Sequence, residues 1–411
     1  MTKRYIAHIT IEAQTPLKVG SGSSDFLQDS PIQKDWNGLP MILGTSIAGV
    51  LRKDYKGDVE DIFGETNGSK VIFSNALLLD STNKVHETLL LEKNDFLKNF
   101  NTLPIREHTA ITSKGIAKDH SKFDEEVLYK GSRFKFSIEM IGDENDSQTW
   151  KDILNLLSKS SFRLGGGSTK GFGKLKILEI KEAMFALNDE SYINLTSSLN
   201  ENFGAIFKPT VTDDNYTTYR LELKADDFFM FGSGFGDDDA DATPVYEKVV
   251  DYEKGGLSDE KVLIPASSIK GAIAHRTTYH YNLLEKLFIG NEKARESISE
   301  IFGEAKSDKD EGSKGRVLFA DLYQDKKQTK VFDHVKIDRF TGGAMDGALF
   351  QEKTISDTTP FVMEILVEKE VDERCVQAYE KTLDDICNGM LPLGGSVNRG
   401  HGVFSGKWSK V

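Results

Sequence analysis

Two glycine-rich stretches decide the fold of this chain: RLGGGSTKGFGKLKI at 163–177 and LPLGGSVNRGHGVFSG at 391–406. Aligned without a gap, they share four glycines at a constant offset of 229 residues. A basic residue precedes the third shared glycine in both, Lys170 in one stretch and Arg399 in the other. One such loop is common in proteins. Two copies at a fixed offset predict a duplicated domain, not a solenoid of short units.

The repeat extends through both halves of the chain in the same order, while its offset drifts from 212 to 246 residues. The drift indicates loops of different length between matching elements. The matching pairs are GSG at 20–22 and 232–234, ILGTSIAG at 42–49 and IPASSIKG at 264–271, DIFGE at 61–65 and EIFGE at 300–304, VIFS at 71–74 and VLFA at 317–320, His108 and His334, and Phe123 and Phe350. We therefore predict domains at 1–186 and 216–411, joined by a polar linker at 187–215.

Composition is that of a globular protein. The 411 residues are 38% hydrophobic and 10% aromatic, which is enough apolar material for two cores. We find no run long enough to span a bilayer and no signal peptide, so we expect a cytoplasmic protein without a membrane partner. Cys375 and Cys387 fall in one predicted helix and are expected to be buried thiols. The net charge of −13 requires that any surface that binds nucleic acid be locally basic.

Hydrophobic spacing predicts the order β-α-β-β-α-β in each half, with an irregular or hairpin excursion after the second strand. On the first strand, Tyr5, Ala7 and Ile9 alternate with Ile6 and His8. This order is the ferredoxin-like (RRM-like) plan of α+β proteins. The predicted strands are 4–14, 71–79, 132–141, 173–180, 219–229, 316–323, 360–367 and 402–408, and the helices are 45–55, 148–158, 267–281 and 371–388.

The glycine loops have two interpretations. Successive glycines allow backbone N–H groups to approach a phosphate, with charge from Lys170 or Arg399. Alternatively, they form a tight turn that needs positive φ angles. The helix openings leave a similar choice: their hydroxyls cap the helix, or the free N–H groups hold a phosphate. The residues concerned are Gly44, Thr45, Ser46, Ser267 and Ser268, with Arg52 and Lys270 on the turns that follow.

Acidic residues gather in the loop after the first strand of each half. The first loop carries Asp25 and Asp29, and the second carries Asp237, Asp238, Asp239 and Asp241. Carboxylates beside a phosphodiester can hold a divalent ion, whereas a run of them can also be a solvated loop. His108 and His334 lie in the excursions. Each is either a general base for RNA cleavage or a packed, hydrogen-bonded residue.

These motifs resemble the RAMP (repeat-associated mysterious protein) superfamily. The resemblance rests on the glycine loop before the last strand, on the helix openings, and on HVKIDRFTGGAMDGALFQEK at 334–353, with a looser copy at 108–125. It covers nearly the whole chain twice and is closest to the backbone subunits of type III CRISPR effector complexes. The chain is similar to a tandem fusion of two such domains, as in the III-D lineage.

The resemblance implies RAMP domains that assemble along a guide RNA with other subunits, each with a thumb-like β-hairpin that kinks the guide–target duplex. It also implies that an Asp, two residues before a Pro, cleaves the target RNA with Mg²⁺ or another divalent ion. Asp29 fits that pattern before Pro31. In the second half Ala242 stands two before Pro244, so Asp241 is expected to be displaced by one residue.

We therefore expect an endoribonuclease with Asp29 and Asp241 as catalytic residues, and Asp29 as the metal ligand. Two alternatives stay open: a scaffold without chemistry, and a guide-precursor RNA endonuclease that uses His108 or His334. The candidate RNA-binding residues are Gly44, Thr45, Ser46, Arg52, His108, Gly165, Gly166, Gly167, Lys170, Gly171, Ser267, Ser268, Lys270, His334, Lys336, Gly394, Gly395, Arg399 and Gly400.

Overall fold

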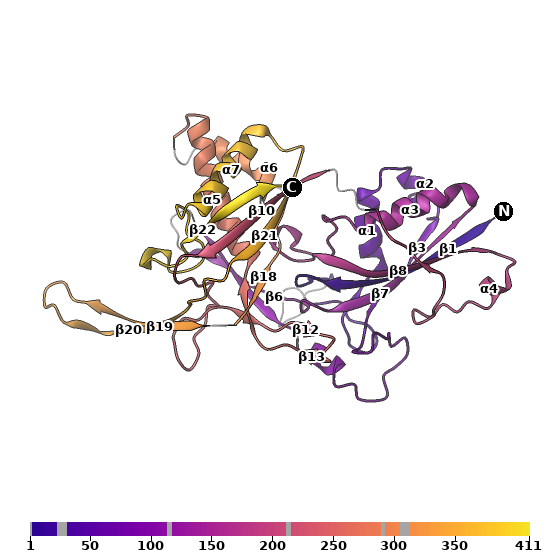
Figure 1. Ribbon diagram of the computed structural model, residues 1–411, viewed down its shortest axis with the longest axis horizontal. Coiled ribbons are helices and arrows are strands. Elements are labelled where there is room, and N and C mark those ends of the chain that lie inside the picture. The colour runs from indigo at the N-terminus through magenta and orange to yellow at the C-terminus, as the bar shows by residue number, and fades with distance from the viewer. Residues whose placement is uncertain are drawn as a thin grey trace.

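The computed structural model describes residues 2–22, 31–112, 117–210, 215–288, 292–304, 312–326 and 328–411. Within them the chain forms two α+β domains, each with one main antiparallel sheet and helices packed on one of its faces (Figure 1). The predicted fold class is confirmed. The amino terminus belongs to the first domain and the carboxy terminus to the second.

The first domain has the strand order expected of β-α-β-β-α-β. Its first strand is central and pairs antiparallel with the third and fourth strands of the plan, and the second strand pairs with the third. Tyr5, Ala7 and Ile9 face the helices and are buried, as their alternation predicts. The elements are β1 (Lys3–Ala13), α1 (Gly44–Asp54), β3 (Val71–Phe73), β7 (Arg133–Gly142), α3 (Ser147–Leu156) and β8 (Leu175–Ala186).

The second domain repeats this arrangement around its own core. The helix α7 (Glu373–Cys387) is amphipathic and buries Tyr379, Leu383 and both cysteines, which are free thiols as predicted. The other elements are β10 (Tyr216–Ala225), α5 (Ala266–Leu284), β17 (Val317–Leu318), β21 (Phe361–Glu368) and β22 (Phe404–Lys410). The sheet order is β17-β21-β10-β22, which is the order of the first domain read by equivalent strands.

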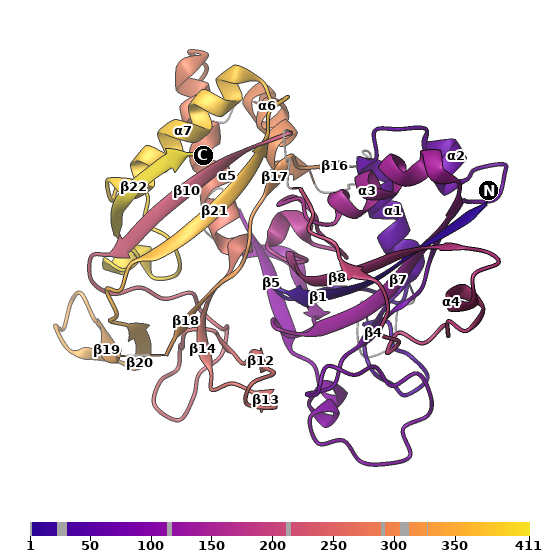
Figure 2. The ribbon, with the colours of Figure 1, turned by 45° about the vertical axis from the view of Figure 1, so that its right-hand side comes forward.

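Each predicted excursion is a two-stranded antiparallel hairpin. The first is β5 (Ile105–Ile111) with β6 (Ala117–Glu126), and the second is β19 (Thr329–Ile337) with β20 (Ala344–Ile355). The second hairpin extends away from the body of the protein (Figure 1). The first lies between the two domains (Figure 2).

Some sequence-based boundaries were wrong. The predicted strand 71–79 is broken into β3 and β4 (Ala76–Leu78), and the strand 316–323 into β17 and β18 (Leu322–Asp325). Each break contains a side chain that accepts a hydrogen bond from the start of a neighbouring helix, Asn75 from Gly44 and Asp321 from Ala266. The spacing of apolar residues does not reveal this contact. The helices α2 (Val59–Phe63) and α6 (Glu292–Phe302) were not predicted, nor was the short helix α4 (Glu190–Ile193). Both α2 and α6 end at the repeated Ile-Phe-Gly-Glu motif.

The polar segment that follows β8 packs against the first domain. Its short strand β9 (Ala205–Ile206) pairs with β8, and Leu199 is buried. The ring of Phe203 meets the ring of His8 edge-on, with centroids 4.5 Å apart. This segment therefore covers His8 on the sheet face opposite the helices. It contains α4 (Glu190–Ile193).

The two domains are joined by a hairpin that only the second copy contains. A bridge between Lys34 and Pro40 in the first domain corresponds to the pair Tyr246 and Val262 in the second, with ten more residues between them. The extra residues form β12 (Val250–Asp251) and β13 (Gly256–Leu257). Tyr252 of this hairpin lies against Phe96 and donates its hydroxyl to the carbonyl of Leu79, both in the first domain.

The short elements not yet named complete the description. They are β2 (Met41–Ile42), η1 (Leu97–Asn101), η2 (Glu144–Asp146), η3 (Ser168–Lys170), β11 (Tyr246–Glu247), β14 (Lys261–Ile264), β15 (Gly303–Glu304), β16 (Ser313–Lys314) and η4 (Val397–Arg399).

Candidate RNA interface

The glycine loops fold back onto the segment that leaves the first strand of their own domain. Gly165 and Gly394 have φ angles of 82° and 100°. A Cβ on Gly165 would lie 2.3 Å from the carbonyl oxygen of Lys18, and one on Gly394 would lie 2.4 Å from that of Met230. The first glycine of each loop is therefore required, because its φ angle is positive and because the nearby carbonyl oxygen leaves no room for a Cβ.

The next glycine of each loop has its amide engaged within the protein. Gly166 donates to the carbonyl of Lys18 at 2.8 Å, and Gly395 donates to that of Met230 at 2.7 Å. These two amides are not free to bind a phosphate. Any contact of the loops with RNA therefore falls to the residues that follow, in the turns η3 and η4.

The basic residue of each loop lies over an aromatic ring at the base of its hairpin. The ammonium of Lys170 is 5.1 Å from the ring centroid of Phe123, and the guanidinium of Arg399 is 4.7 Å from that of Phe350. These distances are typical of cation–π contacts. The predicted basic residues are thus held where the glycine loop meets the hairpin in both domains.

The two histidines stack on the same rings. His108 and Phe123 are opposite each other in the hairpin register, with centroids 5.1 Å apart and planes inclined by 19°. His334 and Phe350 repeat this pairing at 4.8 Å and 22°.

A buried carboxylate beside the rings completes the cluster in each domain. The Lys18 ammonium is 2.5 Å from Glu125, and the His108 imidazole is 3.3 Å away. Burial opposes ionisation of Glu125, but the close contacts with His108 and Lys18 outweigh it and lower its pKa to about 2. Glu352 is fully buried and contacts Arg399 at 2.9 Å and His334 at 3.1 Å. Its position is equivalent to that of Glu125.

The helix openings differ from the predicted capping pattern. Neither helix is capped by its own hydroxyls. Instead, the side chain of Asn75 accepts from the amide of Gly44 at 2.9 Å, and Asp321 accepts from that of Ala266 at 2.8 Å. The prediction that Thr45, Ser46, Ser267 and Ser268 are N-caps is therefore wrong, because a side chain after the second strand takes that role. Arg52 donates to the carbonyl of Gly64, which is a contact within the domain.

Lys270 lies where the domains meet. Its ammonium is 3.3 Å from the hydroxyl of Thr169, in the glycine loop of the first domain. Burial and, to a smaller extent, the nearby charge of Lys170 together lower the pKa of Lys270 to about 8. Among the described residues no carboxylate pairs with Lys270. The equivalent position in the first domain is Ala48, so this cation belongs to the joint alone.

The structure changes the alignment of the acidic loops. Asp29 lies outside the described residues, but both ends of its loop are described. Gly20 bridges to Ile32, and Gly232 bridges to Pro244 with the same separation. The residue three before the bridge is Asp29 in one loop and Asp241 in the other. The predicted displacement of Asp241 by one residue is therefore wrong, because Pro244 is the counterpart of Ile32 and not of Pro31.

The second acidic loop is tied to the base of its hairpin. Asp241 accepts from the backbone amide of Gln351 at 2.7 Å. Asp237 and Asp239 lie 2.5 and 2.8 Å from the ammonium of Lys353. The loop is exposed, as predicted for a solvated run, but it is anchored. Within the described ranges no group of three or more His, Cys, Asp or Glu side chains could hold a metal ion.

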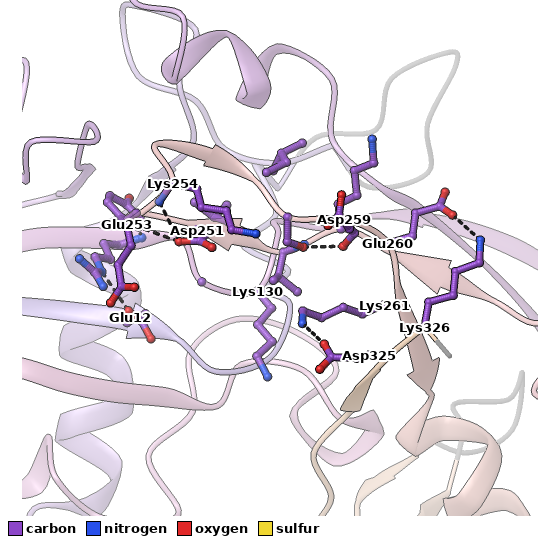
Figure 3. A pocket seen from close by; sticks show the side chains of 18 residues that line it. Glu12, Lys130, Asp251, Glu253, Lys254, Asp259, Glu260, Lys261, Asp325 and Lys326 are labelled. Atoms are coloured by element: carbon purple, nitrogen blue, oxygen red, sulfur yellow. Dashed lines mark hydrogen bonds and ion pairs between the residues drawn. The ribbon is translucent and has the colours of Figure 1, made fainter. Parts of the chain in front are cut away.

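A cleft lies between the domains, away from these clusters. It has a volume of about 1030 Å³ and is bordered by the β12–β13 hairpin (Figure 3). Its charges pair with one another: Lys261 is 2.5 Å from Asp325, and Lys326 is 3.1 Å from Glu260. Because six basic and six acidic residues line it, the cleft has no excess charge to select an anion or a cation.

A protein-family model matches this chain over two regions. The description of that family is the RAMP superfamily, and the matched residues are 10–176 and 222–405. A comparison with curated proteins finds no match. No helix in the described part of the chain is long and apolar enough to cross a membrane. The two matched regions coincide with the two domains and take in both glycine loops and both hairpins, and the chain therefore belongs to the RAMP superfamily as a tandem of two such domains.

Proposed function

We propose that this protein is a guide-RNA-binding backbone subunit of a type III CRISPR effector complex in the cytoplasm, and that it cleaves complementary target RNA. Membership of the RAMP superfamily supports a CRISPR-associated, RNA-binding role. The observation that carries the proposal is the duplicated cluster in which a glycine loop, a basic residue and a hairpin base meet. Two equivalent clusters in one chain suit a ligand that repeats along its length, such as the backbone of an RNA strand.

The permanent charges of the clusters are suited to RNA phosphates. The head groups of Lys170 and Arg399 each lie over an aromatic ring, and the side chain of Arg399 is 39% exposed. Lys270 is half-buried beside Lys170 without an anionic partner in the described structure. A phosphate at this joint would offset the repulsion between the two ammonium groups and would restore the pKa of Lys270 toward its usual value. The joint would thus hold the guide from both domains at once.

The cleavage proposal concerns Asp29. A divalent ion held by Asp29 would supply charge stabilisation for a phosphate attacked by the adjacent 2′-hydroxyl. Because Asp29 is outside the described residues, its fit to an ion rests on its place in the loop. The described residue Ile32, which follows the loop, forms a β-bridge with Gly20. Its backbone amide donates a hydrogen bond to the carboxylate of Glu126 at 3.0 Å. These contacts fix the end of the loop at the hairpin base.

A variant of the assembled complex tests this. Asp29→Ala is expected to remove cleavage at the position served by the first domain, while guide binding stays unchanged. Asp25→Ala, which alters another acid of the same loop, serves as the matched control and should leave cleavage intact. If the Asp29→Ala complex still cuts target RNA at every position, the catalytic assignment is refuted. The alternative of a non-catalytic scaffold subunit would then remain.

The guide-precursor nuclease is a separate candidate with a separate signature. In the structure both of its proposed bases are stacked on phenylalanine rings beside buried carboxylates. His108→Ala and His334→Ala are therefore expected to disturb hairpin position, and precursor cleavage that persists in chelator but disappears in these variants would favour this function instead.

A further inference from the structure

The base of the hairpin carries opposite charges in the two domains. The hairpin register aligns Glu125 with Glu352, and therefore Glu126 with Lys353. Glu126 accepts a backbone amide from the end of the first acidic loop. Lys353 instead donates to two carboxylates of the second loop, those of Asp237 and Asp239. The two loops have equal length between their bridges, so the charge reversal does not follow from a difference in loop length.

Lys353 is well placed to hold the second loop. Its side chain is only 10% exposed, whereas those of Asp237 and Asp239 are 42% and 72% exposed. The backbone on both sides of it is also fixed, since Lys353 donates to the carbonyl of Ala242 at 2.8 Å and Ala242 donates to that of Gln351 at 3.1 Å. Lys353 therefore approaches the loop from the protein side, and solvent lies on the other side.

The arrangement does not fit a divalent ion. Two carboxylates that share one ammonium are already neutralised to within one charge, and a second cation would have to enter against that ammonium. The side chain of Asp241, the remaining candidate ligand, is directed to the amide of Gln351. In the first domain the corresponding position supplies no cation, because it is Glu126.

We propose that Lys353 is the built-in counter-ion of the second acidic loop: it positions the segment that carries Asp241 and excludes divalent cations from it. The two domains then differ in whether their acidic loop carries its own counter-ion. Exclusion of the ion is a property of the chain alone, whereas the link to Asp241 in cleavage rests on the proposed function.

Terbium luminescence measured on the full chain without RNA tests the exclusion. The parent is Asp29→Asn, which removes the candidate site of the first domain from the signal. Adding Lys353→Met should create a terbium site with an affinity about tenfold or more above the parent, because two unpaired carboxylates then face solvent. Lys353→Arg, which keeps the charge, should show no gain. Asp237→Asn with Asp239→Asn should abolish any gain in the Lys353→Met chain.

Two outcomes would overturn the proposal. The first is a Lys353→Met chain, shown to be folded by its circular dichroism and melting temperature, that binds terbium no better than the parent. The second needs no variant at Lys353: a parent chain whose terbium binding is lost on Asp237→Asn with Asp239→Asn would already hold an ion at this loop.

The positioning role is tested in the assembled complex, where the product cut by the first domain is an internal control. Lys353→Met should reduce the product of the second domain selectively, and Lys353→Arg should restore it. If Asp241→Ala removes that product but Lys353→Met does not, the positioning role fails while the proposed function stands. If Asp29→Ala leaves all products, the proposed function fails, and the terbium result is unaffected.

Discussion

One buried arginine bonds to several groups across the joint between the domains, and its removal gives a quantitative prediction. Arg106, on β5 of the first domain, has a side chain only 8% exposed. It donates to Glu247 at 2.5 and 2.8 Å, to the hydroxyl of Tyr323 at 3.0 Å, and to Asp321, all in the second domain. The Asp321 side chain is fully buried, and that of Glu247 is 10% exposed.

Arg106→Met would leave two carboxylates buried without their cation. Removing one partner of a buried ion pair costs roughly 3–5 kcal/mol, because the remaining charge has no compensation. The amide of Asp321 reports this loss directly, since it donates across the joint to the carbonyl of Gly171 at 3.3 Å. A loss of about 4 kcal/mol in the free energy of opening corresponds to exchange of this amide about a thousandfold faster.

The assay is native-state hydrogen exchange, with amides in the centre of each sheet as internal references. Adding Glu247→Gln and Asp321→Asn to Arg106→Met should recover much of the lost protection, because no buried charge then remains. Asn is already the capping residue at the equivalent Asn75. If Arg106→Met accelerates exchange of the reporter amide less than about fivefold, corresponding to roughly 1 kcal/mol, the joint does not depend on this network.

Two further predictions concern titration. Burial and the charge of Lys135 lower the pKa of His8 to about 4, so only the unfolded chain takes up a proton between about pH 6.5 and 4. The unfolding free energy should therefore fall over that window, and urea titrations should show a smaller fall for His8→Leu; parallel pH profiles for the two chains would contradict this. At pH 7, below its folded pKa of about 8, Lys270 is protonated in both folded and unfolded chains, and in the folded chain its charge is destabilised by burial and by Lys170. Lys270→Gln should therefore raise the melting temperature of the free protein, yet weaken guide-RNA binding and lower the slope of log affinity against log salt by about one; unchanged RNA affinity and slope would rule out a phosphate contact.

The repeat itself determined how much of the fold was predictable. Alternation along β1 and the matched order of motifs were sufficient to predict two β-α-β-β-α-β domains with hairpin excursions. Propensity failed where a neighbouring element decided the outcome. Asn75 and Asp321 cap the helices from another part of the chain, so the hydroxyls of the helix openings gave a misleading local signal.

The site was predicted in part for the same reason. Lys170, Arg399 and the two histidines were selected by their recurrence, and the structure brings each pair to an equivalent hairpin base. Glu352 and Lys353 were quoted within a motif but given no role, because a cross-strand register is needed to show which loops they contact. A comparison of the paired positions Glu126 and Lys353 would have revealed the charge reversal from sequence.

The ten extra residues that carry Tyr252 have a consequence for assembly. Separate subunits meet only as often as their concentration allows, whereas two halves of one polypeptide are always within reach of each other. The β12–β13 hairpin belongs to the second domain and packs against the first, so the relative position of the two domains does not depend on protein concentration. A ligand that contacts both domains therefore meets two binding clusters at a fixed distance, which is established when the single chain folds.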